Sequence, residues 1–294
     1  MIKYLKLEYI IKFEELVIWN KSPNFIIRSV LGYQLRNLTC VIKSNTCESC
    51  MLNSSCVYAN FFETPIEKDK INLLGRNKAP HPFTLSVDLL DKDKASIQII
   101  FIGISRNYIP YITLALEKAG ENGVSKSRTK FNIEEIKNAN TGELFNFDIK
   151  LIDKKSSVWP TNINRYESFT IDFITPCRIK SKGHFLNNIT IENLLIASER
   201  RIVLLDSLYG DSSFLKLNDD KNIKSFSLNQ RWVDLNYYSS RQRKALKIGG
   251  VVGSIKVNDS LNEYQSQLLN SAEIFNVGKN ISMGLGRIGV KKED

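Results

Sequence analysis

A glycine-rich stretch near the C-terminal end of the sequence indicates the fold. It reads Phe275-Asn276-Val277-Gly278-Lys279-Asn280-Ile281-Ser282-Met283-Gly284-Leu285-Gly286-Arg287-Ile288-Gly289-Val290. Four glycines within a dozen residues leave backbone N–H groups uncovered by side chains, so the loop can approach a phosphate. A glycine-rich turn is also how a chain reverses tightly between two elements. The rest of the chain has to decide between these two uses.

The elements before this loop follow a recognisable order. Apolar periodicity predicts a helix directly before the loop and a strand after it. The expected elements are a strand at 168–175, a helix at 189–209, strands at 231–238 and 245–257, and a helix at 261–274. Strand, helix, strand, strand, helix, strand is the order of a ferredoxin-like domain.

The first half of the chain repeats this order in pattern, without detectable sequence identity. Strands are expected at 3–13, 83–90, 95–102, 131–136 and 143–151, and helices at 23–38 and 108–119. One side of the first helix is predicted to carry Phe25, Ile26, Ser29, Val30, Tyr33 and Leu38. The sequence therefore predicts an α+β protein with two tandem ferredoxin-like (RRM-like) domains, at 1–155 and 165–294.

A cysteine-rich segment interrupts the first domain. Cys40, Cys47, Cys50 and Cys56 are separated by six, two and five residues. Because disulfides are rare in a reducing cytosol, four such thiolates suggest a structural zinc site without an open position. An iron–sulfur cluster uses the same ligands, and unligated thiols in a surface loop are the other alternative. Residues 40–80 show little periodicity, so they are predicted to be an insertion held by something other than a hydrophobic core.

The overall charge points to an anionic partner. The 294 residues carry a formal net charge of +10, which suits nucleic acid or an acidic membrane surface. The start of the chain lacks the apolar core of a signal peptide, and no later run has transmembrane length. We therefore expect a cytoplasmic protein that does not bind membranes.

Basic residues beside aromatic ones favour RNA as the partner. Arginines near Trp232, Tyr237 and Tyr238 suit phosphate pairing and base stacking with single-stranded or stem-loop RNA. The predicted RNA-binding residues are Arg178, Lys180, Arg241, Arg243, Lys244, Lys247, Gly278, Lys279, Gly284, Gly286 and Arg287. The sequence contains no nucleotide-binding P-loop and no tight acidic cluster of the two-metal nuclease kind. A nuclease built on this chain is therefore expected to work without a catalytic metal.

Several short motifs in a fixed order form a family resemblance that runs from about residue 30 to the end. They are Leu35-Arg36 to Cys40 with Cys47, Cys50, Cys56-Val57-Tyr58 and Phe61-Phe62-Glu63, then Ala79-Pro80-His81-Pro82-Phe83, Phe173-Ile174-Thr175-Pro176-Cys177-Arg178, Trp232-Val233-Asp234, Tyr238-Ser239-Ser240-Arg241-Gln242, Gly249-Gly250-Val251-Val252-Gly253, and Val277-Gly278-Lys279 to Gly284-Leu285-Gly286. Together they resemble the CRISPR repeat-processing endoribonuclease of the repeat-associated mysterious protein superfamily, in its cysteine-containing branch.

The resemblance implies metal-independent cleavage of the CRISPR precursor transcript within each repeat. The 2′-hydroxyl upstream of the scissile phosphate attacks it, which leaves a cyclic phosphate and a 5′-hydroxyl. That chemistry needs a base, a proton donor for the leaving oxygen and cationic groups for the phosphorane charge.

The sequence departs from the family pattern at one point. The family's best-known pattern has a histidine in or just after the first helix, whereas residues 24–60 here contain none. Tyr33 and Lys43 are available in that region. His184, in a basic glycine-flanked loop, is predicted to be the general base or acid, with Lys182 or Lys180 as charge stabiliser.

Two other functions stay open. The missing early histidine favours a non-catalytic RNA-binding subunit of a CRISPR effector complex, which would use the same loop and basic groove. A basic, zinc-stapled DNA-binding or regulatory protein is the third class.

Overall fold

The computed structural model describes residues 1–43, 46–66, 78–145, 147, 149–160, 166–211, 223, 225–239 and 244–292. The chain divides into two compact units. The N-terminal unit contains Ile2–Ser157 and Leu208–Gly210, and the C-terminal unit contains Met1, Val158–Ser207 and Asp211–Asp294.

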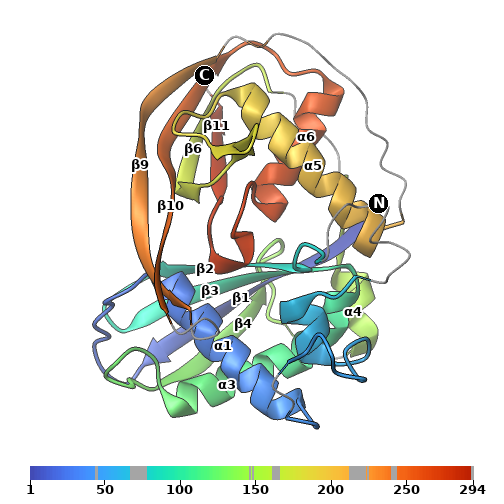
Figure 1. The fold of residues 1–294 in the computed structure, drawn as a ribbon, viewed down its shortest axis with the longest axis vertical. Helices are drawn as coiled ribbons and strands as arrows, with labels where there is room; N and C mark the ends of the chain where they lie inside the picture. Colours follow the sequence, from blue (N-terminus) through green and yellow to red (C-terminus); the bar gives the residue numbers. More distant parts are fainter. Residues whose placement is uncertain are drawn as a thin grey trace. The chain divides into compact units, whose positions relative to one another are not determined.

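The N-terminal unit contains a five-stranded sheet with helices on one face (Figure 1), in which four antiparallel strands form one path and β5 pairs with β1 off that path. Its strand order is β2-β3-β1-β4, the order of a ferredoxin-like fold. In chain order the elements are β1 (Ile2–Phe13), α1 (Pro23–Thr39), a π-helical turn η1 (Ala59–Glu63), β2 (Phe83–Leu89), β3 (Lys94–Ile102), a 3-10 turn η2 (Gly103–Tyr108), α3 (Ile109–Asn122), β4 (Phe131–Asn138), α4 (Ile149–Lys155) and β5 (Ser157–Trp159).

The buried face of α1 matches the predicted one only in part, although Phe25 is buried as expected. Ile27, Leu31 and Leu35 are fully buried, whereas Tyr33 is 65% and Leu38 42% exposed. The helix carries two apolar rows, and local periodicity cannot say which of them meets the sheet. Packing selects the row with residues four apart, and this leaves Tyr33 at the surface.

Part of the cysteine-rich insertion belongs to the core, contrary to the prediction. Phe61 and Phe62 of η1 are buried. The Phe61 ring stacks on Phe83 of β2, with centroids 4.1 Å apart and an interplanar angle of 4°. The two phenylalanines therefore attach the insertion to the sheet by apolar burial.

The strand predicted at 143–151 is wrong. Leu144 makes only an isolated bridge with Lys137, and Ile149 begins the short helix α4. A seven-residue helix offers too little periodicity to be distinguished from a strand by apolar spacing alone.

The C-terminal unit has the same architecture. Its sheet order is β11-β6-β10-β9, and α5 and α6 lie on one face of it (Figure 1). The elements are β6 (Ser168–Cys177), β7 (Lys180–Ser181), β8 (His184–Phe185), α5 (Ile191–Tyr209), β9 (Ser225–Ser239), β10 (Lys244–Asn258), α6 (Glu263–Phe275), a 3-10 turn η3 (Ile281–Met283) and β11 (Ile288–Lys292). The protein is thus built from two tandem ferredoxin-like domains, as predicted.

Local sequence features explain where α6 begins and why residues 168–177 form strand β6. Asn262 caps α6, because its side chain accepts a hydrogen bond from the Gln265 backbone while the Gln265 side chain accepts one from the Asn262 backbone. Phe169 and Ile171 of β6 are fully buried and alternate with half-buried polar residues.

Among the described residues, no helix has the length and apolar character needed to cross a membrane.

Candidate nucleic-acid interface

A small hairpin, β7–β8, places the predicted catalytic residues of the C-terminal unit. Its turn consists of Lys182 and Gly183, both with positive φ, at 44° and 88°. Lys180 pairs with Phe185, and Ser181 pairs with His184. Directly opposed residues share one face of a two-stranded ladder, so Lys180 lies with Phe185 while His184 lies on the other face.

Arg178, between β6 and the hairpin, is held by several groups. Its Nη1 donates a hydrogen bond to the Gly249 carbonyl at 2.8 Å. Its guanidinium carbon lies 3.8 Å from the centroid of the Phe185 ring and 5.9 Å from that of Trp232. Burial lowers the pKa of Arg178, and the nearby Asp234 carboxylate opposes that shift. Arginine stays charged despite such a shift, so the site keeps a fixed cation.

Two glycines of β10 make this arrangement possible. A Cβ at Gly249 would lie 2.3 Å from the Trp232 indole nitrogen and 2.4 Å from a carboxylate oxygen of Asp234. These two side chains are themselves joined by a hydrogen bond of 2.8 Å from Trp232 to Asp234. A Cβ at Gly250 would lie 2.9 Å from the Cys177 carbonyl. The Gly249-Gly250 pair is therefore a position of close approach.

Most of the glycine-rich loop is buried. Gly284 and Gly286 are buried, and both have positive φ, at 82° and 72°. The Gly286 N–H donates to the Pro176 carbonyl, and its own carbonyl accepts from Val277. Their part in RNA binding stays a prediction, and the structure gives them a further role as turn residues.

The accessible part of the loop is its first turn. Lys279 is exposed and Gly278 half-buried. The Lys279 N–H donates to the Arg178 carbonyl at 2.8 Å, and Gly278 forms a bridge with the same residue. The loop and the hairpin are therefore connected through Arg178. Arg287 is half-buried at the start of β11, where its N–H donates to the Thr175 hydroxyl.

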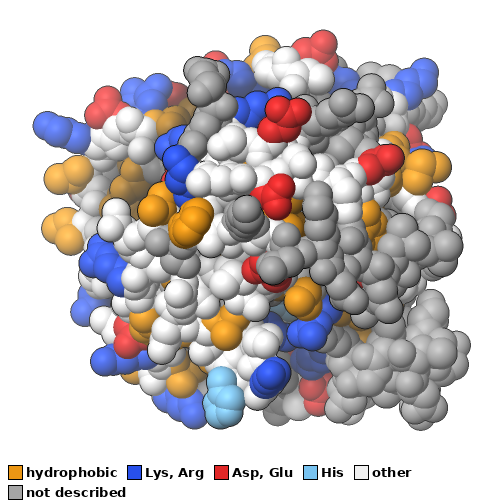
Figure 2. All heavy atoms as spheres, turned by 90° about the horizontal axis from the view of Figure 1, so that it is seen from above, with side chains coloured by type: hydrophobic (Ala, Val, Ile, Leu, Met, Phe, Trp, Pro, Cys, Tyr) orange, Lys and Arg blue, Asp and Glu red, His pale blue; other side chains and the backbone are white. Residues whose placement is uncertain are grey.

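The remaining basic residues lie on β10 or outside the described residues. Lys244 and Lys247 are exposed at the start of β10. Lys247 is directly opposite Asn236, two positions from the Gly249–Asp234 pair on the same strand face. Arg241 and Arg243 fall outside the described residues. Figure 2 shows a face of the molecule on which lysine and arginine side chains lie among exposed hydrophobic ones.

The predicted catalytic residues come from both units. Tyr33 lies in α1 and Lys43 follows it with φ 52°; both are exposed in the N-terminal unit. His184 and Lys182 are exposed on the hairpin of the C-terminal unit. Within the described residues, His184 has no hydrogen-bond or ion-pair partner that would orient its ring.

A cation–aromatic cluster beside α1 was not predicted. Arg28 lies 5.1 Å from the Phe62 ring centroid, and its Nη2 is 3.4 Å from Nε2 of His81. His81 stacks nearly parallel to Phe83, with centroids 5.7 Å apart. The available sequence signal is the run 79–83, which belongs to the motifs of the family resemblance.

The Tyr58 ring forms a second part of this cluster. The Arg36 guanidinium lies 5.8 Å from its centroid. Burial raises the pKa of the Tyr58 hydroxyl, and the charge of Glu63 adds to the effect.

The contact of Arg178 with Phe185 and Trp232 in the C-terminal unit was not predicted from the sequence either, because these residues come from three separate segments.

The four cysteines of the insertion are half-buried free thiols. Cys40 follows α1, and the Cys50 N–H donates to the Cys47 carbonyl within a turn. Burial raises the pKa of Cys47, and the charges of Glu63, Cys56 and Cys40 also raise it. Among the described residues, no three His, Cys, Asp or Glu side chains are arranged as ligands of one metal ion.

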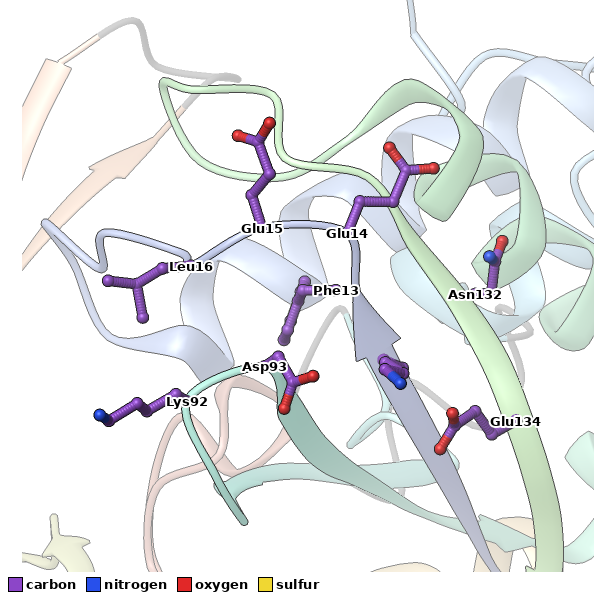
Figure 3. A pocket seen from close by; sticks show the side chains of 9 residues that line it. Phe13, Glu14, Glu15, Leu16, Lys92, Asp93, Asn132 and Glu134 are labelled. Carbon is purple, nitrogen blue, oxygen red and sulfur yellow. The ribbon is translucent and has the colours of Figure 1, made fainter.

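A hollow of about 630 Å³ lies at the end of β1 in the N-terminal unit. Figure 3 shows the carboxylates of Glu14 and Glu15 on one side and those of Asp93 and Glu134 on the other. Four carboxylates repel phosphate, although Lys94 neutralises Glu134 through a contact of 2.7 Å. The hollow is also lined by Lys12 and Lys92, so charges of both signs surround it.

Two ferredoxin-like domains, with a cationic hairpin and a glycine loop on the second, define a class of tandem RNA-binding protein. The family model AF_1859_N, described as an N-terminal domain, matches residues 2–167, which is more than half of the chain. A second model, described as CRISPR-associated endoribonuclease Cas6, matches residues 171–288. The chain is therefore a Cas6-type protein: residues 171–288 belong to the CRISPR-associated endoribonuclease Cas6 family, and residues 2–167 form the AF_1859_N domain.

Solved structures share the fold across both units. The Cas6 (TTHB231) product complex is 11% identical with a TM-score of 0.58, and the alignment covers 98% of this chain and 99% of that chain. The Cas6 (TTHA0078) product complex is 14% identical with a TM-score of 0.54, at 99% and 100% coverage. A partial Cas6-RT-Cas1–Cas2 complex is 12% identical with a TM-score of 0.55, and all of this chain matches 46% of that one. No curated protein matches the chain.

Proposed function

We propose that this protein cleaves CRISPR precursor transcripts within each repeat, without a catalytic metal, and so matures guide RNAs in the cytoplasm, where those transcripts are made. The observation that carries the proposal is the match to the Cas6 endoribonuclease model over residues 171–288, which include the cationic hairpin and the glycine loop. These two elements meet at Arg178, which gives the RNA backbone a fixed cation beside exposed lysines.

In the proposed reaction the 2′-hydroxyl attacks the adjacent phosphorus, and the bond to the 5′-oxygen breaks. A base takes the 2′ proton, and an acid protonates the leaving oxygen, so the products are a cyclic phosphate and a 5′-hydroxyl. His184 is our choice for the base or the acid. Lys182 or Lys180, on the same hairpin, would stabilise the phosphorane charge, and Tyr33 and Lys43 are the candidates from the N-terminal unit.

Cleavage of cognate repeat RNA in EDTA tests the proposal. We expect single-site cleavage at the same rate with EDTA or Mg²⁺, and product ends that carry a cyclic phosphate and a 5′-hydroxyl. A repeat with a 2′-deoxy nucleotide immediately upstream of the scissile phosphate should bind and stay intact. Cleavage only with Mg²⁺, or cleavage of the 2′-deoxy repeat, would refute the mechanism.

A second candidate function is that of a non-catalytic RNA-binding subunit of a CRISPR effector complex. The observation that favours it is the exposed position of His184, because a catalytic histidine is usually oriented by a partner. The same assay separates the two: tight binding of the repeat with no cleavage under any metal condition supports the subunit.

We also propose that the four cysteines of the insertion bind a structural zinc ion. Four thiolates are a complete ligand set for a structural zinc ion, and the charges of Cys40 and Cys56 act on the pKa of Cys47, although the described side chains are not arranged around one ion. Metal analysis should find about one zinc per chain, and Cys50→Ser should lower that content and the melting temperature. A metal-free protein with an unchanged melting temperature in chelator would contradict the site, and detection of iron would point to a cluster instead.

A further inference from the structure

The Phe185 side chain is an exposed aromatic ring in a rigid setting. The ring is 37% exposed at the end of β8. Phe185 belongs to a hairpin with only two residues in each strand, so contacts outside the hairpin have to hold the ring. The Arg178 guanidinium lies 3.8 Å from its centroid, and the Trp232 ring lies 6.3 Å away at an interplanar angle of 50°. This cation–aromatic contact favours one orientation of the ring.

The support under the ring is itself fixed. The Arg178 Nη1 bond to the Gly249 carbonyl and the Trp232 bond to Asp234 hold two of the three stacked groups. Because Gly249 has no side chain, the Trp232 indole and the Asp234 carboxylate can lie directly against β10, where a Cβ would come within 2.3 and 2.4 Å of them. Because the ring is held before any ligand arrives, stacking on it costs little additional conformational entropy.

The groups around the ring match the parts of a nucleotide. Lys180 is the register partner of Phe185, and its Nζ lies 5.9 Å from the ring centroid. Lys180 and Lys182 are both exposed, so their charges are available to a phosphate. A planar aromatic surface beside two ammonium groups suits a flat base joined to an anionic backbone.

We infer that Phe185 is the stacking platform for an unpaired nucleobase of the RNA, with Lys180 binding a phosphate of the same strand and Arg178 positioning the ring. The base has to be unpaired, because inside a duplex both faces of each base are covered by its neighbours. The inference rests on the proposed RNA-processing function and assigns the hairpin a place in it. The platform recognises single-stranded RNA, at a loop or flank of the repeat.

The test uses Phe185→Leu, Phe185→Tyr and a matched control, Phe226→Leu. Phe226 is 57% exposed in the same unit and lies opposite Lys256 in the sheet, and no arginine of the described residues stacks on it. The probe is a short single-stranded RNA with one 2-aminopurine, whose fluorescence falls when the base stacks. Cognate repeat RNA is measured in parallel.

We expect Phe185→Leu to weaken binding of the single-stranded probe about tenfold and to remove the fluorescence quenching, because stacking on an aromatic contributes about 1–3 kcal/mol per base. Phe185→Tyr and Phe226→Leu should behave like wild type. Lys180→Ala should weaken binding while leaving the quenching of bound probe intact, and it should lower the salt dependence.

The outcomes separate this inference from the function on which it rests. If wild-type protein cleaves its repeat while Phe185→Leu, with an unchanged melting temperature, binds and quenches normally, the platform is refuted and the function stands. Equal losses for Phe185→Leu and Phe226→Leu would also overturn it. If wild-type protein fails to bind repeat RNA, the proposed function fails instead.

Discussion

His184 illustrates how little a residue's chemistry says without its surroundings. It is one of two histidines in the chain and lies on an exposed hairpin, whereas His81 is packed against Phe83. The fold therefore leaves His184 accessible to an RNA phosphate and gives it no structural task. Whether it transfers a proton is a question for kinetics.

We predict that His184→Ala lowers the single-turnover cleavage rate about 10²- to 10⁴-fold, the usual contribution of a positioned acid or base. RNA affinity and melting temperature should stay near wild type, because the side chain is exposed. Tyr33→Phe and Lys43→Ala, measured in the same assay, rank the N-terminal candidates. A full rate for His184→Ala would remove this residue from the mechanism.

Gly286 shows a stronger residue-level constraint. A Cβ there would lie 1.9 Å from the Val277 carbonyl oxygen, and φ is 72°. Gly183 is a matched control, since its φ is 88° but a Cβ would meet nothing within 4 Å. Gly183→Ala should cost about 1–2 kcal/mol for the left-handed conformation alone.

Gly286→Ala should cost at least about 2 kcal/mol more, because the clash is with backbone that is already hydrogen-bonded. Urea unfolding of the two variants measures the difference. Equal costs for both glycines would show that the loop relaxes freely, contrary to the close packing described here.

Strand β6 ends in a buried thiol, Cys177, whose contribution to the free energy of unfolding depends on pH. Cys177 is fully buried, and burial raises its pKa from 9.0 to about 12. Above about pH 9 the unfolded chain loses this proton while the folded chain keeps it, so the unfolded state binds fewer protons. The stabilisation of the folded state by the protonated Cys177 thiol is therefore complete below pH 9 and is lost as the pH rises toward 12.

We predict that the stability difference between wild type and Cys177→Ala shrinks by about 1.4 kcal/mol per pH unit above pH 9. Urea unfolding at about pH 8, 9 and 10 checks this, and the variant cancels the titration of other groups. A difference that is constant with pH would mean that water reaches the thiol.

For the whole molecule, the net charge of +10 makes RNA affinity sensitive to salt. The double variant Lys244→Ala/Lys247→Ala should weaken binding and reduce the slope of log Kd against log salt by about 1.4, since each phosphate contact on a single strand contributes about 0.7. Lys94 and Lys118 are each paired with a glutamate and provide the control. An identical slope for both double variants would exclude the start of β10 from the RNA path.

Much of the fold was predictable, because element order depends on local patterns. The strand and helix periodicities at 3–13, 108–119 and 168–175 hold in the structure, and the repeated order implied the ferredoxin-like topology. The error at 143–151 has the same origin, since a short segment carries too little periodicity.

The site was less predictable than the fold. Sequence patterns identified the basic residues of the hairpin, but not that the Arg178 guanidinium would lie over the Phe185 ring with Trp232 nearby. That contact joins segments about fifty residues apart, and it depends on the register of β9 against β10 and on the missing side chain of Gly249.

Local sequence patterns predicted two ferredoxin-like domains and a glycine loop placed between a helix and the last strand, and the structure has both. Only the tertiary structure decided which side of α1 is buried, that Phe61 and Phe62 anchor the insertion, and that most of the glycine loop is internal. The difference lies in the sequence separation of the interactions. Helix and strand patterns arise from residues close together in the chain, whereas burial depends on which distant segments pack against each residue once the sheet has formed.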